Sequence, residues 1–269
     1  MFLNSRYELL SFKYIPSKMR FLFDRRLLFQ RLLLAAVFIV FTCIAVIPTD
    51  VSGNWRTASR ASVGIAPDPV STHEAVIQVY GARAYSWRGY LGIHTWIAVK
   101  PTHADTYTIY EVLGWRQRRH LPVLTIYDQI PDRRWFGSMP VILADKRGEG
   151  VDDLIARIDR AAQDYPYAKQ YTLWPGPNSN TFTAWVSRAV PELELNLPAT
   201  AIGKDYLGYR LFATPPSGSG FQFSVFGLLG VVISNVEGFE FNFLGLTFGI
   251  ASDPWAVKLP IVGSIQLAS

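Results

Sequence analysis

Residues 92–114, GIHTWIAVKPTHADTYTIYEVLG, contain two strand-like runs separated by a short polar break. The runs IHTWIAVK (residues 93–100) and TYTIYEVLG (residues 106–114) are rich in β-branched and aromatic side chains, which favour strands. The break PTHAD between them is short and polar. We therefore predict an antiparallel hairpin in this part of the chain.

Elements on both sides of the hairpin indicate a mixed fold. Residues 151–164 repeat apolar side chains at helical spacing, and Tyr165-Pro166 ends that helix. A second helix is predicted after the turn WPGPN, with Asn178 or Ser179 as its N-cap. The sequence therefore predicts the α+β class, with an antiparallel sheet and packed helices. Further strands are predicted at residues 74–80, 122–127 and 140–144.

The C-terminal part contains an internal repeat. GFQFSVFGLLG, from Gly220, is echoed by GFEFNFLGLTFG, from Gly238, at an offset of 18 residues. Each copy alternates Phe with polar residues and reaches Gly at its eighth position, which predicts strands with one apolar face. We expect the copies to form one long hairpin joined by SNVEG. This hairpin either covers the core or rests its Phe face on a bilayer.

The composition excludes several classes of protein. With 49% hydrophobic and 17% charged residues, the chain of 269 residues is not intrinsically disordered. Its single cysteine, Cys43, excludes an intramolecular disulfide and a cysteine-based zinc cluster. Residues 1–31 hold seven basic and two acidic side chains, which accounts for the whole net charge of +5. Because the remainder is neutral, we expect no nucleic-acid partner. No nucleotide or metalloprotease motif occurs, and we expect no cofactor and no metal.

Residues 32–47, LLLAAVFIVFTCIAVI, form an uncharged run that ends at Pro48. As a helix the run would reach roughly 24 Å, a little less than a bilayer core. The basic flank before it predicts that residues 1–26 are cytoplasmic, that residues 27–48 are a transmembrane anchor, and that the rest is extracytoplasmic. Two alternatives are a buried core helix and a cleaved signal peptide. We expect a single-pass protein of the inner membrane.

The rest of the chain divides by composition. Residues 49–72, rich in Ser, Thr, Ala, Pro and Gly, are expected to be a linker. Residues 73–212 are expected to form the α+β domain, and residues 213–269 a Phe- and Gly-rich β-hairpin extension. Because the only cysteine lies in the anchor, the extracytoplasmic part has no thiol nucleophile.

His94 is one half of a candidate site, because it lies inside a predicted strand. If the break at residues 101–104 pairs Lys100 with Asp105, paired residue numbers sum to 205 and Glu111 falls opposite His94. The carboxylate would then hold the tautomer and orientation of the imidazole. A lone histidine in a strand is more often structural, and a slip of one residue would move Glu111 to the other face.

Ser179 is the other half of the candidate site. It lies in WPGPNSNTF (residues 174–182), where the turn enters the second helix. Backbone N–H groups and the positive end of the helix there would stabilise an oxyanion. A serine at a helix start is more often only a cap.

These two motifs resemble the circularly permuted papain-like arrangement of the lecithin retinol acyltransferase-like and permuted NlpC-like proteins. In those families an Asn-Cys motif begins the helix. Here Asn178-Ser179-Asn180-Thr181-Phe182 stands in that pattern, and His94-Thr95-Trp96 resembles their histidine strand. Serine replaces cysteine, and a serine needs a stronger base.

The resemblance implies a permuted papain-like fold and a hydrolase or acyltransferase that acts on an amide or ester. Ser179 would attack, His94 would be the general base, and Glu111 would orient His94. The neighbouring residues of the same motifs are assigned to binding: Asn178, Asn180, Trp96 and Trp174.

More broadly, the extracytoplasmic segment resembles a bacterial family of unknown function, number 3750. The resemblance rests on EAVIQVYGARAYSWRG, HTWIAVKP, YEVLGW, WFG, YPYA, WPGPNSNTF, AIGKDYLG and FGLLG, and covers about residues 52–266. It implies a bacterial envelope protein and no established activity. Two hypotheses follow: an enzyme with a Ser-His-Glu site, or a non-catalytic module at the membrane surface. The module would have membrane lipid as its partner and would bind a lipid, peptide or cell-wall ligand.

Overall fold

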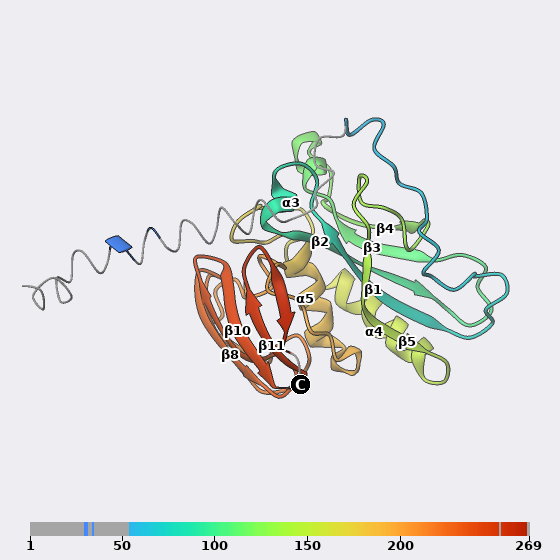
Figure 1. Cartoon of the computed structure of the whole chain (residues 1–269). Helices are drawn as coiled ribbons and strands as arrows, with labels where there is room; N and C mark the ends of the chain where they lie inside the picture. Colours follow the sequence, from blue (N-terminus) through green and yellow to red (C-terminus); the bar gives the residue numbers. More distant parts are fainter. Residues whose placement is uncertain (1–29, 32–33, 35–53, 253, 268–269) are drawn as a thin grey trace, which may run out of the picture. The chain divides into compact units, whose positions relative to one another are not determined.

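The computed structural model describes residues 30–31, 34, 54–252 and 254–267. The chain divides into two compact units, residues 1–46 and 47–269. Figure 1 shows the helices and strands of the second unit. The expected cytoplasmic tail lies outside the described residues, as does the anchor except at Gln30, Arg31 and Leu34. Within the described residues, no helix has the length and apolar character needed to cross a membrane.

Five antiparallel strands form the first sheet, in the order β4-β3-β2-β1-β5. Each of the five predicted strand runs forms a strand, and the α+β class with an antiparallel sheet is confirmed. The strands are β1 (Val76–Arg83), β2 (Ile93–Lys100), β3 (Thr108–Val112), β4 (Leu124–Asp128) and β5 (Val141–Arg147).

The register between β2 and β3 differs from the predicted one by two residues. Ile97 pairs with Tyr110, so paired residue numbers sum to 207 rather than 205. The connecting loop is longer than expected because its backbone binds elsewhere: His103 N donates to His73 O at 2.9 Å. A shift of two residues leaves every side chain on its predicted face of the sheet.

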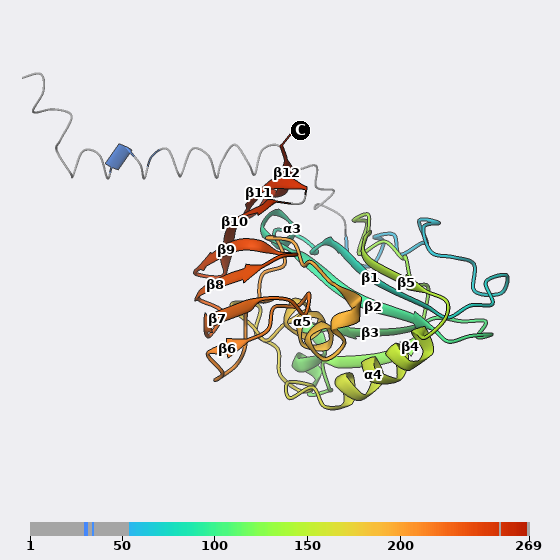
Figure 2. The ribbon, with the colours of Figure 1, turned by 90° about the horizontal axis from the view of Figure 1, so that it is seen from below.

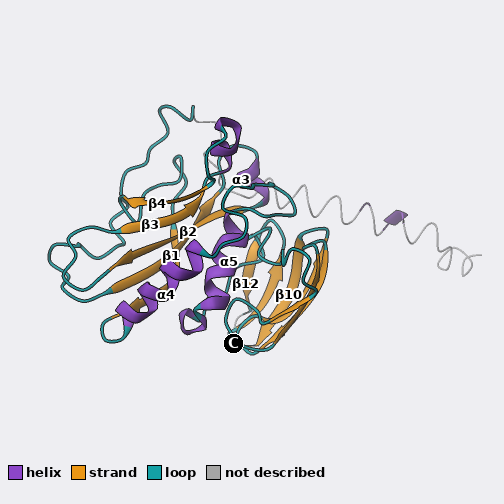
Figure 3. Cartoon of the chain, turned by 180° about the vertical axis from the view of Figure 1, so that it is seen from behind, coloured by secondary structure: helices purple, strands orange, loops and turns teal. Residues whose placement is uncertain are grey.

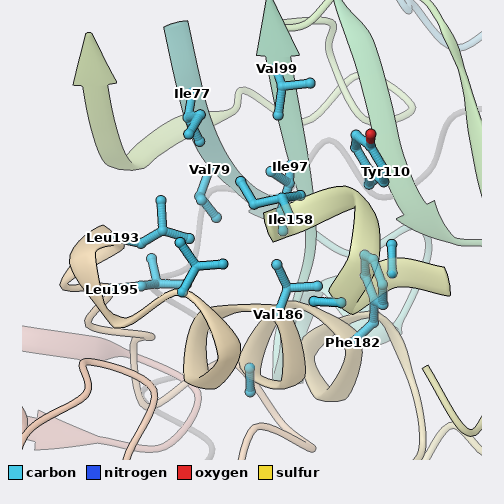
Figure 4. Close-up of a cluster of buried hydrophobic side chains, with 14 of the residues drawn as sticks. Ile77, Val79, Ile97, Val99, Tyr110, Ile158, Phe182, Val186, Leu193 and Leu195 are labelled. Carbon is cyan, nitrogen blue, oxygen red and sulfur yellow. The ribbon is translucent and has the colours of Figure 1, made fainter. Parts of the chain in front are cut away.

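Two helices cover one face of this sheet (Figure 3). These are α4 (Val151–Gln163) and α5 (Ser179–Ala189), both close to their predicted ranges. Their apolar sides meet the strands in the main core (Figure 4), whose members include Ile77, Val79, Ile97, Val99, Ile158, Phe182 and Val186. A single turn of helix, α3 (Arg88–Leu91), connects β1 to β2.

The opposite face of the first sheet has a second, aromatic core. Trp96 and Tyr80 stack there with their rings 5.5 Å apart, and Trp135 covers them from a loop. The segment before β1 packs against that loop, because Ser62 and Arg133 form a β-bridge and Arg134 N donates to Ala61 O at 2.9 Å. Part of the segment expected to be a linker is thus hydrogen-bonded to the domain.

The C-terminal part forms a second antiparallel sheet of seven strands, in the order β12-β11-β10-β9-β8-β7-β6 (Figure 2). The prediction of one long hairpin is wrong, because each repeat copy folds into a hairpin of its own. The strands are β6 (Phe212–Ala213), β7 (Phe221–Val225), β8 (Leu229–Ser234), β9 (Gly238–Phe243), β10 (Leu246–Ser252), β11 (Trp255–Leu259) and β12 (Gly263–Gln266).

The glycine at the eighth position explains the hairpins. Gly227 and Gly245 have φ of 68° and 76°, and the residue before each also has positive φ, as type I′ turns require. The chain therefore reverses within each copy instead of continuing as one strand. A third hairpin, β11–β12, has its glycine at Gly263, again 18 residues further on.

Helix α5 lies between the two sheets (Figure 2). Its other side meets the segment that leads to β7: Ser187 Oγ donates to Pro216 O at 2.7 Å. Arg188 Nη2 donates to Gln222 Oε1 on β7 at 2.8 Å. The first sheet, the helices and the second sheet thus form three consecutive layers.

Candidate functional site

Glu111 of β3 accepts hydrogen bonds in the interior of the domain. Its side chain is fully buried, and Arg133 Nη2 donates to Oε1 at 2.6 Å. The Tyr127 hydroxyl donates to the same oxygen, and His94 Nε2 lies 3.2 Å from Oε2. The structure therefore brings His94 and Glu111 together, as predicted, although they are not directly opposite in the ladder.

The His94 imidazole is packed between aromatic rings. Its centroid lies 3.7 Å from that of Trp135 and 5.9 Å from that of Trp96, in stacked orientations. The guanidinium of Arg133 lies over the same two tryptophans, and its Nη1 is buried with no hydrogen-bond partner in the part of the chain described. This cluster holds the loop at residues 131–135 onto the sheet.

Burial and charge set the protonation states of this cluster. Burial lowers the pKa of His94, and the neighbouring Glu111 carboxylate offsets this only in part. Burial acts to raise the pKa of Glu111, but the hydrogen bond from His94 and the charge of Arg133 hold it below its usual value. At neutral pH the cluster thus contains a charged Glu111–Arg133 pair and a neutral imidazole.

Ser179 lies on the other side of the first sheet from His94. The hydroxyl of Thr95, the next residue of β2, is 3.0 Å from Asn180 Oδ1 and 2.8 Å from Thr183 Oγ1, both on α5. Successive strand residues point to opposite faces, so Thr95 faces α5 and His94 faces away from it. The structure does not bring Ser179 together with His94, because the sheet separates them.

Asn178 and Asn180 hold the start of α5 in place. Asn178 is the N-cap of a capping box: its Oδ1 accepts from the N–H groups of Asn180 and Thr181, at 3.0 and 3.1 Å. The Asn180 amide donates to Ile93 O and Ile202 O, at 3.1 and 2.8 Å. Both side chains therefore fix the helix start, Asn180 to β2 and both to the loop before β6.

The two tryptophans assigned to binding make different contacts. Trp96 is fully buried, and its Nε1 donates to Pro131 O at 2.8 Å. Trp174 is half exposed, and its Nε1 donates to Leu244 O in the β9–β10 turn at 2.8 Å. Trp174 thus joins the turn before α5 to the second sheet.

The second sheet has an exposed face that is almost entirely apolar. In a row across the strands, Phe221 pairs with Ile233, Ile233 with Phe239, and Phe239 with Ile250, and each is 48–57% exposed. Ser252 is the single polar side chain among the outward-facing residues of β6–β12. We call this surface the apolar face; its large exposed members are Phe212, Phe221, Leu229, Ile233, Phe239, Phe241, Phe243, Phe248, Ile250, Trp255 and Ile265.

The inner side of the same sheet is polar and buried. Gln222, Glu240 and Lys258 occupy equivalent positions of the three hairpins. Gln222 Nε2 donates to Asp205 Oδ1 at 2.7 Å, and Lys258 Nζ donates to Glu240 Oε1 at 2.7 Å. Glu240 also pairs with Lys204. The sheet therefore binds the domain through hydrogen bonds and ion pairs and directs its apolar side outward.

The sequence analysis missed several residues of these clusters. Arg133 and Tyr127 do not belong to a sequence motif that includes Glu111, because they approach it from a loop and from a neighbouring strand. The third hairpin could have been found from Gly263, which follows Gly245 by 18 residues.

These contacts define an α+β protein with two antiparallel sheets. Residues 74–206 match a family described as "Protein of unknown function (DUF3750)". The resemblance to that family is confirmed over this range, which is shorter than the expected residues 52–266 and stops before the second sheet. Comparisons with curated proteins and with solved structures found no match.

Proposed function

We propose that this protein is a non-catalytic module that binds the surface of a lipid bilayer through its apolar face. The observation that supports this proposal is the outward side of the second sheet, where phenylalanines and aliphatic side chains are about half exposed. Six half-exposed phenylalanines alone expose on the order of 500 Å², and a contiguous apolar patch of several hundred Å², here enlarged by the aliphatic residues and Trp255, often marks an interaction surface.

The inner face of the sheet argues against the alternative in which the repeat covers a core. A core-covering sheet would turn its phenylalanines inward, whereas here Glu240 and Lys258 are the inward, buried residues. Each of these charged groups has a partner of opposite charge. Turning the sheet over would remove these ion pairs, and buried charges without partners are strongly unfavourable.

The length of the N-terminal segment favours lipid as the partner over a second copy of the chain. Gly137 N donates to Ser59 O at 2.9 Å, so the segment is attached to the domain from residue 59 onward. Ser59 follows Pro48 by eleven positions, and a chain of that length spans at most about 40 Å. If residues 27–48 anchor the protein in the inner membrane, the domain stays close to the bilayer, on its extracytoplasmic side.

The composition of the apolar face also suits a bilayer. Phenylalanine predominates on the face, and Trp255 (61% exposed) lies on a strand near one edge. Tyr209, 93% exposed, precedes β6 at the other edge. Tryptophan and tyrosine are enriched where a protein meets the membrane interface.

A fluorescent label on the apolar face tests the proposal. The full-length chain, with Cys43→Ser and Ile233→Cys, is reconstituted into phosphatidylcholine vesicles and labelled at residue 233. We expect a lipid-borne spin label to quench this fluorophore strongly. The matched control is Arg119→Cys, an exposed position on the 3-10 helix after β3, where we expect little quenching by the lipid.

Two results would contradict the proposal. One is quenching of residue 233 by aqueous iodide and not by the lipid. The other is excimer emission from a pyrene at residue 233 without lipid quenching, which would make the apolar face an interface between two copies of the chain.

The hydrolase or acyltransferase hypothesis has weaker support. A general base must lie within hydrogen-bond reach of its nucleophile, or one water away. His94 faces one side of the first sheet and Ser179 lies on the helix that covers the other side, so the papain-like Ser-His-Glu arrangement remains a prediction from the motifs alone. A fluorophosphonate probe that labelled the native chain, and not Ser179→Ala, would favour the enzyme over the binding module.

A further inference from the structure

A cavity of about 220 Å³ lies beside α5, outside both clusters described above. It is bounded by the outer side of α5, by the turn after α4 and by the loop before β6. Its walls carry five aromatic rings and two arginines, and none of its lining residues is acidic. The lining residues include Tyr165, Tyr167, Trp185, Arg188, Tyr206 and Arg210.

Arg188 is a charged group without an ion-pair partner in the part of the chain described. Its Nε donates to Thr214 O at 3.0 Å, and its Nη2 donates to Lys204 O and to Gln222 Oε1. Its Nη1 makes no hydrogen bond to any described residue. Burial lowers the pKa of Arg188 to about 10; the nearby carboxylates of Asp205 and Glu237 act against this shift, and the positive charge of Arg210 acts with it. A guanidinium in such surroundings is stabilised by an anion.

Arg210 provides the second positive charge, and its position is fixed by an aromatic ring. Its guanidinium carbon lies 5.7 Å from the centroid of Trp185, over the ring. The Arg210 side chain is exposed, so it is free to contact a ligand that enters from solvent. Both arginines line the same small cavity, and the planar donor fork of a guanidinium matches a phosphate or carboxylate.

The aromatic rings of the wall are not parallel to one another. Tyr165 meets Tyr167 at 80° and Trp185 at 63°, and Tyr167 meets Tyr206 at 66°. These pairs are edge-to-face rather than parallel, so none of them forms a slot for a flat group, and the ring faces can pack against the C–H edges of a saturated ring. The Tyr165 hydroxyl is buried and has no hydrogen-bond partner among the described residues, which leaves one polar group of the wall unsatisfied.

We propose that this cavity binds a sugar ring that carries a phosphate or a carboxylate. The anionic group lies between Arg188 and Arg210, and the ring packs its C–H edges against the tyrosines and Trp185. The tyrosine hydroxyls of the wall bind hydroxyl groups of the sugar. The site does not depend on the proposed membrane contact, because it lies on α5 and two loops rather than on the apolar face.

Titration calorimetry on the full-length chain in phosphatidylcholine nanodiscs tests this site. The probes are glucose 6-phosphate, glucuronate and glucose. We expect both anionic sugars to bind, and glucose to bind roughly tenfold more weakly or not at all, because it lacks the charged group. Arg210→Gln is expected to weaken the anionic sugars by a similar factor, and Tyr206→Phe, which removes one hydroxyl of the wall, to weaken all sugars.

The matched control is Arg119→Gln, which removes an equally exposed arginine elsewhere and leaves the affinities unchanged. Equal binding of glucose and glucose 6-phosphate, no binding of either anionic sugar, or no effect of Arg210→Gln overturns the proposal. Phosphatidylinositol in the nanodisc distinguishes the two sources of ligand. If phosphatidylinositol in the nanodisc competes with glucose 6-phosphate for the cavity, the ligand is a lipid headgroup. If it does not compete, the ligand is a soluble or polymeric saccharide.

Discussion

Glu111 is the residue on which the largest number of buried polar side chains converge in the first sheet. His94, Tyr127 and Arg133 all contact its carboxylate. Glu111, His94 and Arg133 are buried, and Tyr127 is partly buried. In each contact a donor group loses its hydrogen bonds to water and gains one to the charged Glu111 carboxylate. The cluster therefore stabilises the fold only while all of its members are present.

Replacing Glu111 by Gln is expected to lower the free energy of unfolding by about 3–5 kcal/mol, because Arg133 is left buried without its counter-charge. Urea denaturation measures this change. Glu149→Gln, at an exposed position after β5, is the matched control and should alter stability by less than about 0.5 kcal/mol. A small effect of Glu111→Gln would mean that the Glu111–Arg133 pair contributes little to the fold.

The same cluster predicts that acidification lowers stability. The pKa values of His94 and Glu111 both lie below their usual values of 6.5 and 4.5 in the folded chain. The unfolded chain therefore binds protons first, so stability falls as the pH drops below 6.5 and falls further below 4.5. His94→Phe, which keeps a ring against Trp135, is expected to remove the loss that begins at pH 6.5. Urea midpoints measured from pH 8 to pH 4 test this, and an unchanged profile would contradict it.

At the scale of elements, the alternation of residues along a strand predicted the face of each side chain correctly, whereas the predicted pairing between β2 and β3 was wrong by two residues. Alternation placed His94 and Glu111 on one face, and this survived a register error of two residues because the side-chain period is two. Neighbouring positions of β2 show the limit of the same argument. Thr95 rather than His94 faces α5, and sequence spacing does not indicate on which face of a sheet a distant helix packs.

The capping of α5 gives a test at this scale. Asn178→Ala is expected to destabilise the chain by about 1–2 kcal/mol, because it removes the cap. It also removes the hydrogen bonds that the Asn178 side-chain amide donates to Leu173 O and Ile202 O. Ser179→Ala, the adjacent change, removes no cap and is expected to cost less. Thermal unfolding of both variants checks the order, and a larger loss for Ser179→Ala would contradict this account of the helix start.

At the scale of the whole molecule, the orientation of the second sheet could not be predicted from its strands. The alternation of Phe with Gln, Ser, Glu and Asn shows two unlike faces. Which face turns inward depends on Asp205 and Lys204, which lie in a loop before the repeat and bind Gln222 and Glu240. Because of these contacts the polar side of the sheet is buried, although apolar residues usually occupy the interior of a protein.

The proposed N-terminal anchor leads to a testable prediction of the orientation of the chain. Because the basic residues precede the apolar run, we expect residues 1–26 in the cytoplasm and the domain outside. A reporter that is active only outside the cytoplasm, fused after residue 60, should be active. Activity of a cytoplasm-dependent reporter at the same site, with the first one silent, would reverse the assignment.

The three hairpins of the second sheet have a consequence for how such a protein can vary. Each hairpin is an 18-residue unit that pairs only with its neighbours, as in repeat proteins. Insertion of one more unit at the β12 edge would widen the sheet by about 10 Å, twice the spacing of strands, and would leave the first sheet untouched. Each duplication of this 18-residue segment would therefore enlarge the apolar face by about the same area.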